Sequence, residues 1–293
     1  MNTVLGKDVG TVIGMSVAGV LCDYGFAGGW PSVFYVFGMA GCIWSIAWFL
    51  IIYDTPPSHP LISTGELDYW ERAIGTEDLS MRPPTPWRAM LTSVPVWALS
   101  IASLTYNWGY FTLATCLPMY MNDVLGFSWT HTGTYSAVPF LASFVMYPVC
   151  GTLADWLRAP GRLSTTTVRK LFCVVAFVSS GCLLCLTSYF GCDRVPAVTT
   201  LFAVMTCMCI GMPVVYVNQL DLAPLHAGKV MGLTYTVGNL GAIGATVAVG
   251  GITNVGRTVE EWQEVFILAA LVNGFGALVF VIFGSGERQS WAD

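Results

Sequence analysis

Charged side chains are scarce in this sequence. Asp, Glu, Lys and Arg make up 10% of its 293 residues, whereas soluble proteins carry about 25%. No window has a run of like charges, so we expect no binding to nucleic acid. Because 55% of the residues are hydrophobic, the scarcity of charge also excludes an ordinary soluble globular protein.

Histidine is rarer still, with three in the chain. His59, His131 and His226 lie in or at the edges of loops, and none pairs with an acidic cluster that could hold a metal. Cys182 and Cys185 form a Cys-x-x-Cys string, but inside an apolar stretch inert packing is the better interpretation. No nucleophile–base set is visible. We therefore predict no enzyme, no metal site and no cofactor.

Long apolar segments are abundant. A membrane-spanning helix needs about 20 apolar residues, because lipid leaves its backbone groups to be satisfied within the segment. The sequence therefore predicts an all-α, multi-pass integral membrane protein. Its eight expected spans are Val9–Gly29, Val33–Tyr53, Pro95–Tyr120, Gly133–Trp156, Val168–Phe190, Pro196–Asn218, Lys229–Ile252 and Glu264–Gly284.

The connection between the second and third spans is long, polar and rich in proline. Such a segment is typical of a linker between two packed units, here with a short amphipathic helix around Glu66–Ile74. Two spans precede it and six follow. We therefore divide the chain into residues 1–53, a linker of residues 54–94, and residues 95–293.

Basic residues are distributed unevenly between the two sides of these spans. Basic residues resist transfer across a membrane, so the side that carries more of them is predicted to be cytoplasmic. Arg194 and Arg257 fall on one side of the membrane and the other ten basic residues on the opposite side. The side with ten also carries both termini and the linker, which are therefore predicted to be cytoplasmic. In this assignment, no Lys or Arg lies deep within any predicted span. The ten on the cytoplasmic side are Lys7, Arg72, Arg82, Arg88, Arg158, Arg162, Arg169, Lys170, Lys229 and Arg288.

A charged loop follows the second span after the linker. Gly151, Asp155 and Arg158 are spaced there as Gly-x-x-x-Asp-x-x-Arg. This spacing and position resemble the signature loop of the major facilitator superfamily, in which two six-helix halves move against each other. The alternative is an ordinary charged loop. An acid at a helix C-terminus is opposed by the helix dipole, so we expect Asp155 to face the first span near Gly10–Gly14, steadied by Arg158, as a conformational latch.

Longer motifs extend the resemblance along nearly the whole chain. They are Gly29–Gly38, His59–Ser63, Pro86–Arg88, Trp108, Gly126–Phe127, Ser136–Pro139, Leu163–Lys170, Asn218–Pro224, Met231–Gly232, Glu261–Gln263 and Ser285–Ala292. Together these motifs resemble one family within that superfamily, the anion:cation symporters, which includes sialin, the type I sodium–phosphate cotransporters and the vesicular glutamate transporters.

The resemblance implies eight of the twelve helices of the superfamily fold. Residues 1–53 would hold the last two helices of the N-terminal half, and residues 95–293 the complete C-terminal half. It further implies secondary active transport of phosphate or a small organic anion, with sodium or a proton as the coupling ion. The membrane would be the plasma membrane or a lysosomal or vesicular membrane.

The same comparison implies four further spans before Met1. Alternating access needs two complete bundles around a midplane site, and no basic residue lies deep in the predicted spans to bind an anion. We therefore expect this chain not to transport by itself. The rival interpretation is a truncated membrane protein that acts by association with another transporter.

One face of the span Pro95–Tyr120 is polar. Spacings of three and four put Ser103, Asn107 and Tyr110 on that face, with Tyr106 adjoining it. Buried polar groups need partners, so the face should point into the bundle. A substrate-pathway wall and mere interhelical hydrogen bonding both remain open. Vesicular glutamate transporters carry an arginine where this chain has Tyr106, which favours a phosphate-like or sialin-like substrate over glutamate.

Three further polar residues are candidates for the same pathway. Asn218 lies at the cytoplasmic end of its span, where a helix cap is an equally good interpretation. Tyr235 and Asn239 lie in the glycine-rich span Lys229–Ile252, where close packing of backbones is the default explanation. Tyr235 stands where relatives usually have asparagine, so the local substrate contacts are expected to differ.

Overall fold

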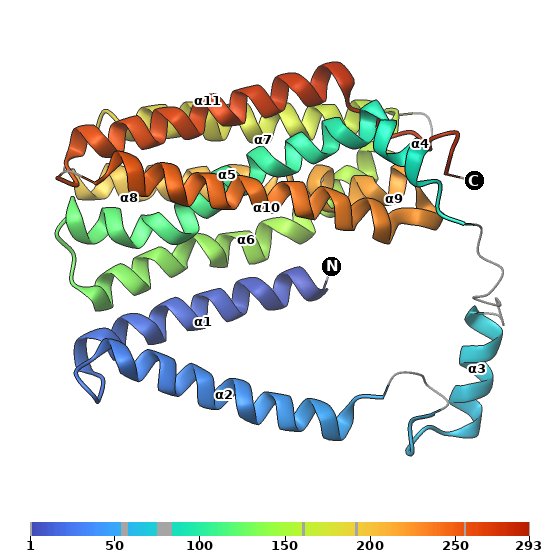
Figure 1. The fold of residues 1–293 in the computed structure, drawn as a ribbon, viewed down its shortest axis with the longest axis horizontal. Helices are drawn as coiled ribbons and strands as arrows, with labels where there is room; N and C mark the ends of the chain where they lie inside the picture. The colour runs from blue at the N-terminus through green and yellow to red at the C-terminus, as the bar shows by residue number, and fades with distance from the viewer. Residues whose placement is uncertain are drawn as a thin grey trace.

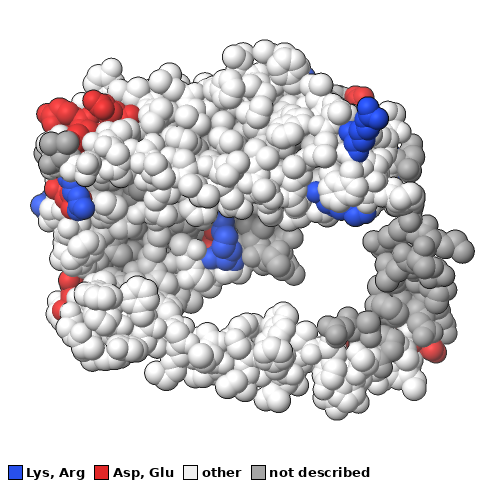
Figure 2. All heavy atoms as spheres, viewed as in Figure 1, with Lys and Arg blue, Asp and Glu red and all other residues white. Residues whose placement is uncertain are grey.

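The computed structural model describes residues 2–53, 58–74, 84–159, 162–190, 193–254 and 256–292. Within these ranges the secondary structure is helical and contains no strand. The all-α prediction is therefore confirmed. Charged side chains gather at the two ends of the main bundle, and the face between them is almost entirely uncharged (Figure 2), as a lipid-facing surface requires.

The C-terminal part forms a bundle of long helices that run side by side (Figure 1). Its central helix α5 packs against α10 and α11, while α8 packs against α6 and α7. Large buried side chains fill the space between them, among them Phe140, Phe177, Phe280 and Trp262. The helices are α5 (Val94–Asp123), α6 (Trp129–Leu157), α7 (Thr165–Thr187), α8 (Arg194–Cys209), α9 (Asn218–Leu222), α10 (Ala227–Ile252) and α11 (Val259–Phe283).

Two helices precede the linker, α1 (Asn2–Tyr24) and α2 (Trp30–Ile51). α1 lies against α6, and α2 lies on the far side of α1 (Figure 1). The α1–α6 contact depends on two glycines. A Cβ added at Gly19 would lie 2.7 Å from the Trp129 carbonyl oxygen, and one at Gly133 would lie 2.5 Å from that of Met15. Small residues therefore let these two backbones meet.

Six helical segments in the described ranges are long and apolar enough to cross a membrane. They are Trp30–Ile51, Trp129–Leu157, Thr165–Thr187, Arg194–Leu222, Pro224–Ile252 and Val259–Phe283. α5 is longer still, at 30 residues, but its polar face lowers its hydropathy. All eight predicted spans overlap helices whose ends differ from the predicted ones by a few residues, and two of the spans differ more substantially.

The first difference is the start of α1. The apolar run begins at Val9, but the helix begins at Asn2 and contains Lys7 and Asp8. Hydropathy marks the apolar part of a helix and not its full length, and lysine has a good intrinsic helix propensity. α1 ends at Tyr24, before a turn in which three successive residues, ending at Gly29, have positive φ.

The second difference is the span that was expected as one helix over Pro196–Asn218. α8 stops at Cys209, a π-helix covers Pro213–Val217, and α9 continues to Leu222. Proline lacks the N–H that a regular α-helix would need inside its ladder. At Gly211 the chain also approaches α7, where an added Cβ would lie 3.3 Å from the Ala176 methyl. π-turns of this kind occur frequently at functional sites.

Two short helices lie in the region predicted as a linker. α3 covers Thr64–Ile74, where the amphipathic pattern predicts it, and α4 covers Trp87–Thr92. α4 joins a second small core formed by Met90, Val96, Ala223, Val230 and Ala292. The segment after α11 is tied to the same end of the bundle, because the Gln289 N–H donates to the Leu222 carbonyl at 2.9 Å.

Candidate functional site

A cavity of about 330 Å³ opens between α6, α7, the π-helix and α10. Three tyrosines give it hydroxyl groups, and Asp155 and Arg169 give it charged groups. The residues that line it are Tyr147, Gly151, Ala154, Asp155, Arg169, Met212, Pro213, Tyr216, Val217, Met231 and Tyr235. The cavity is therefore bounded by hydrogen-bonding groups inside a mostly apolar bundle.

A row of aromatic rings connects this cavity to the middle of α5. Tyr235 meets Tyr216 edge-on at 5.6 Å between ring centroids, and Tyr216 meets Tyr106 edge-on at 6.0 Å. Tyr106 in turn stacks on Tyr110 at 6.3 Å. We call these four residues the tyrosine row. Such geometries are the favoured ones for aromatic pairs.

The structure thus brings together three of the predicted pathway residues, Tyr106, Tyr110 and Tyr235. It adds Tyr216 and Tyr147, which the sequence did not single out. Tyr216 lies within an apolar run, and its direction is set by the π-helix, which adds a residue to the turn. No hydropathy pattern predicts that shift.

The three asparagine candidates lie elsewhere. Asn107 donates from Nδ2 to the Ser103 carbonyl at 3.0 Å and touches α10, where a Cβ on Gly238 would be 2.7 Å from it. Asn218 is fully buried and donates from Nδ2 to the Ser285 carbonyl at 2.9 Å. Asn239 is exposed on α10. The contacts of Asn107 and Asn218 favour the packing interpretation that the sequence left open.

A cluster of charges closes the end of the bundle beside the cavity. Arg169 of α7 donates from Nε and Nη2 to Asp221 Oδ2 at 2.8 and 2.7 Å, and Arg158 Nη2 lies 3.3 Å from Asp221 Oδ1. The Arg169 side chain is 2% exposed and that of Asp221 11%. We call these three residues the ion cluster. It joins the end of α6, the start of α7 and α9, and charge-assisted bonds of this kind are short and strong.

The predicted latch differs from the structure in both its parts. Arg158 pairs with Asp221, whereas Asp155 is exposed at the cavity. α1 and α6 run antiparallel, with the Thr130 N–H and hydroxyl bonded to Asp23 at 2.8 and 2.6 Å. At 1.5 Å per residue, Gly10–Gly14 therefore lie about 20 Å along the helix axis from the level of Asp155. The partner of Arg158 could not be predicted locally, because Asp221 lies on another helix.

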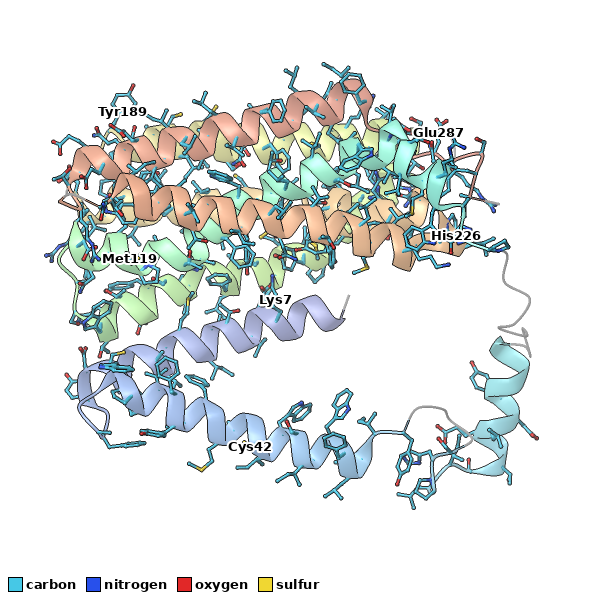
Figure 3. The ribbon with its side chains drawn as sticks, viewed as in Figure 1. Lys7, Cys42, Met119, Tyr189, His226 and Glu287 are labelled. Carbon is cyan, nitrogen blue, oxygen red and sulfur yellow. The ribbon has the colours of Figure 1, made fainter. Side chains whose placement is uncertain are left out.

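Lys7 is a second correction. The sequence placed it in a cytoplasmic segment, outside the spans. It lies inside α1, on the side that faces the bundle (Figure 3), with Nζ 4.4 Å from the centre of the Tyr110 ring. A lysine over an aromatic face is attracted by the ring quadrupole. Lys7 therefore belongs to a helix beside the bundle and not to a connecting segment.

Comparison with known proteins identifies the family. The sequence model described as "Major Facilitator Superfamily" matches residues 4–246. This chain belongs to the Major Facilitator Superfamily. Its helices form part of the superfamily fold, with α1 and α2 beside a six-span bundle.

Individual superfamily members match almost the whole chain. "Putative inorganic phosphate cotransporter" of Drosophila ananassae is 39% identical over 98% of this chain and 60% of its own length. "Sialin" of Ovis aries is 38% identical over 98% of this chain and 57% of its own length. "Vesicular glutamate transporter 3" of Danio rerio is 38% identical over 98% of this chain and 49% of its own length.

These similarities confirm the resemblance to the anion:cation symporters. The relatives are transporters and not enzymes, as the lack of a catalytic set predicts. The chain spans between 49% and 60% of the length of these three proteins. Their identities to this chain are nearly equal, so overall similarity does not choose among their substrates.

Proposed function

We propose that this chain forms part of a secondary active transporter that moves phosphate or a small organic anion, coupled to a sodium or proton gradient. The observation that carries the proposal is the cavity and the tyrosine row that extends from it to the middle of α5. Phenolic hydroxyls can donate hydrogen bonds to anion oxygens. Resemblance to the anion:cation symporters supports the choice of an anion as substrate.

In this proposal the tyrosine row and Tyr147 form the wall that a substrate passes. Asn107 and Asn218 position that wall instead of touching the substrate, because both are held by backbone carbonyls of the bundle. Asn239 is exposed on α10 and would contact substrate only from the outer face of that helix. Tyr106 supplies no fixed charge, which favours phosphate or a sialin-type substrate over a dicarboxylate.

The ion cluster and the loop with Gly151, Asp155 and Arg158 act as a gate in this proposal. Arg158 and Arg169 hold α9 to the ends of α6 and α7 through Asp221. Opening the cavity at this end would require these charges to separate, as interface ion pairs do in other alternating transitions.

The proposed test measures anion binding and uptake by the purified chain of residues 1–293. Isothermal titration with phosphate, sialic acid and glutamate gives binding, and proteoliposomes with an imposed sodium or proton gradient give uptake. Saturable uptake of phosphate or sialic acid supports transport by this chain. Binding without uptake supports the sequence-based expectation that the chain needs a partner. Absence of binding to all three anions overturns the proposal.

We also propose that both termini face the cytoplasm, as the distribution of basic residues predicts. Tyr189 and Glu287 lie at opposite ends of the bundle (Figure 3), and both side chains are exposed. In intact cells expressing the chain, an impermeant maleimide should label Tyr189→Cys and leave Glu287→Cys unlabelled, with the native cysteines as background control. The reverse pattern would refute the orientation.

A further inference from the structure

We propose that Lys7 and Asp8 of α1 form an exchange pair, in which a substrate anion binds the Lys7 ammonium and the released Asp8 carboxylate takes up a proton. The inference rests on the proposed function, because it requires an anionic substrate. It assigns the substrate-binding charge and the coupling proton to two adjacent residues.

Asp8 is buried between helices. It lies on the same stripe of α1 as Met15 and Gly19, at spacings of seven and eleven residues, and this stripe faces α6. Its side chain is 0% exposed, and both carboxylate oxygens lack a hydrogen-bond partner among the described residues. The Lys7 ammonium, with Nζ 3.7 Å from Oδ1, is the ion-pair partner of this carboxylate.

Lys7 is partly open to solvent, unlike its neighbour. Its side chain is 44% exposed, and it lies at the hollow beneath the bundle (Figures 2 and 3). The same ammonium lies over Tyr110, the inner end of the tyrosine row. An anion that moves along the row would therefore meet Lys7 at its end.

Competition for Lys7 follows from this arrangement. An anion that binds the Lys7 ammonium more strongly than the Asp8 carboxylate does draws the ammonium away. The carboxylate is then left without its ion-pair partner and without a hydrogen-bond donor. A lone buried charge is strongly unfavourable. The carboxylate is neutralised when a hydronium ion in the hollow gives its proton to Oδ1 or Oδ2, which forms the new O–H bond and leaves a water molecule. One anion and one proton are then bound together.

Other titratable groups near the pair do not compete for this proton. Asp8 or Lys7 interacts electrostatically with Tyr110 of α5, Tyr147 of α6, Cys209 of α8 and Tyr216 of the π-helix. Tyrosine and cysteine already carry their protons near pH 7. Asp8 is therefore the group in this cluster that can accept one.

The test uses the purified chain of residues 1–293 and counts protons as well as affinity. Titration of phosphate in two buffers of different ionisation enthalpy gives the number of protons taken up per anion. The natural chain should take up about one proton per bound anion. Lys7→Gln should weaken binding by about tenfold or more, since a charge-assisted contact is lost, and Lys7→Arg should restore most of it. Asp8→Asn should bind phosphate without proton uptake.

Two further variants keep the result interpretable. Lys7→Gln leaves Asp8 unpaired and could unfold the chain, so the double variant Lys7→Gln with Asp8→Asn removes both charges and should lose both affinity and proton uptake. Lys229→Gln removes an exposed lysine at the start of α10 and should behave as the natural chain. Unchanged affinity in the double variant, or unchanged proton uptake in Asp8→Asn, overturns the exchange pair. If the natural chain binds no anion, the proposed function fails first.

Discussion

The two helices before the linker, α1 and α2, differ in polarity and in how they pack, and the more apolar of the two is the less buried. α2 is strongly apolar and contains no charged residue, yet among its described side chains it buries only Ser32. α1 carries Lys7 and Asp8, yet its backbone meets that of α6 at Gly19 and Gly133. The more polar helix is therefore the one that packs on the bundle, and the more apolar helix faces outward. In a membrane protein, polarity marks contact with protein and apolarity marks contact with lipid.

The six-span bundle of residues 95–293 can be compared with α1 and α2 by the contacts that hold each of them in place. Its end is held by the ion cluster and by the segment after α11, whereas α1 is held mainly along its contact with α6, which we call the α1–α6 seam, and α2 mainly by α1. We therefore expect substitutions to lose their effect on stability in the order bundle, α1, α2.

The largest effect is expected at Asp221. Asp221→Asn leaves Arg169, whose side chain is 2% exposed, without a carboxylate and should lower the free energy of unfolding by about 3–5 kcal/mol. Thermal or SDS unfolding of the purified chain measures it. Asp155→Asn is the matched control, because Asp155 is exposed, and should change the free energy by less than about 0.5 kcal/mol. Equal losses in both variants would contradict the ion cluster.

An intermediate effect is expected at the α1–α6 seam. Gly19→Ala places a Cβ 2.7 Å from the Trp129 carbonyl oxygen, and overpacking of this kind costs about 1–3 kcal/mol. Gly14→Ala, on the same helix with nothing within 4 Å of the added atom, should be neutral or stabilising by up to about 1 kcal/mol. Crosslinking between α1 and α6 should fall in Gly19→Ala alone. If Gly14→Ala is the more damaging change, the seam is misplaced.

The smallest effect is expected on α2. A Cβ added at Gly41 meets nothing within 4 Å, and the residue is exposed. Gly41→Ala should therefore change the free energy of unfolding by no more than about 0.5 kcal/mol, in the same unfolding assay. A loss as large as that of Gly19→Ala would mean that α2 is packed against protein in the purified chain.

Much of the fold could be predicted from the sequence, because lipid demands long apolar helices and eight such stretches are visible. The broken helix from α8 to α9 could not, since Pro213 interrupts the α-helical hydrogen bonds and Gly211 approaches α7, and hydropathy reports neither effect. The resemblance identified the family, and helical spacing brought Tyr106 and Tyr110 together.

The charged groups were harder to predict. Arg158 and Asp221 are 63 residues apart along the chain and meet because the bundle brings α9 to the end of α6. Lys7 was assigned to a loop because the apolar run starts at Val9, although the helix already includes it. Both errors have one cause. Sequence patterns report the neighbours along a helix, whereas the partner of a buried charge is set by packing between helices.

The contact between α1 and α6 at Gly19 and Gly133 allows α1 to tilt about one end. Backbone meets backbone at Gly19 and Gly133, while Asp23 fastens the adjacent end of α1 to Thr130. At 1.5 Å per residue, Lys7 lies about 18 Å along the helix from Gly19, so a tilt of about 5° at the seam would carry it about 1.5 Å. A slight rocking of α1 at its fastened end is thus magnified into a displacement of the ammonium relative to Tyr110.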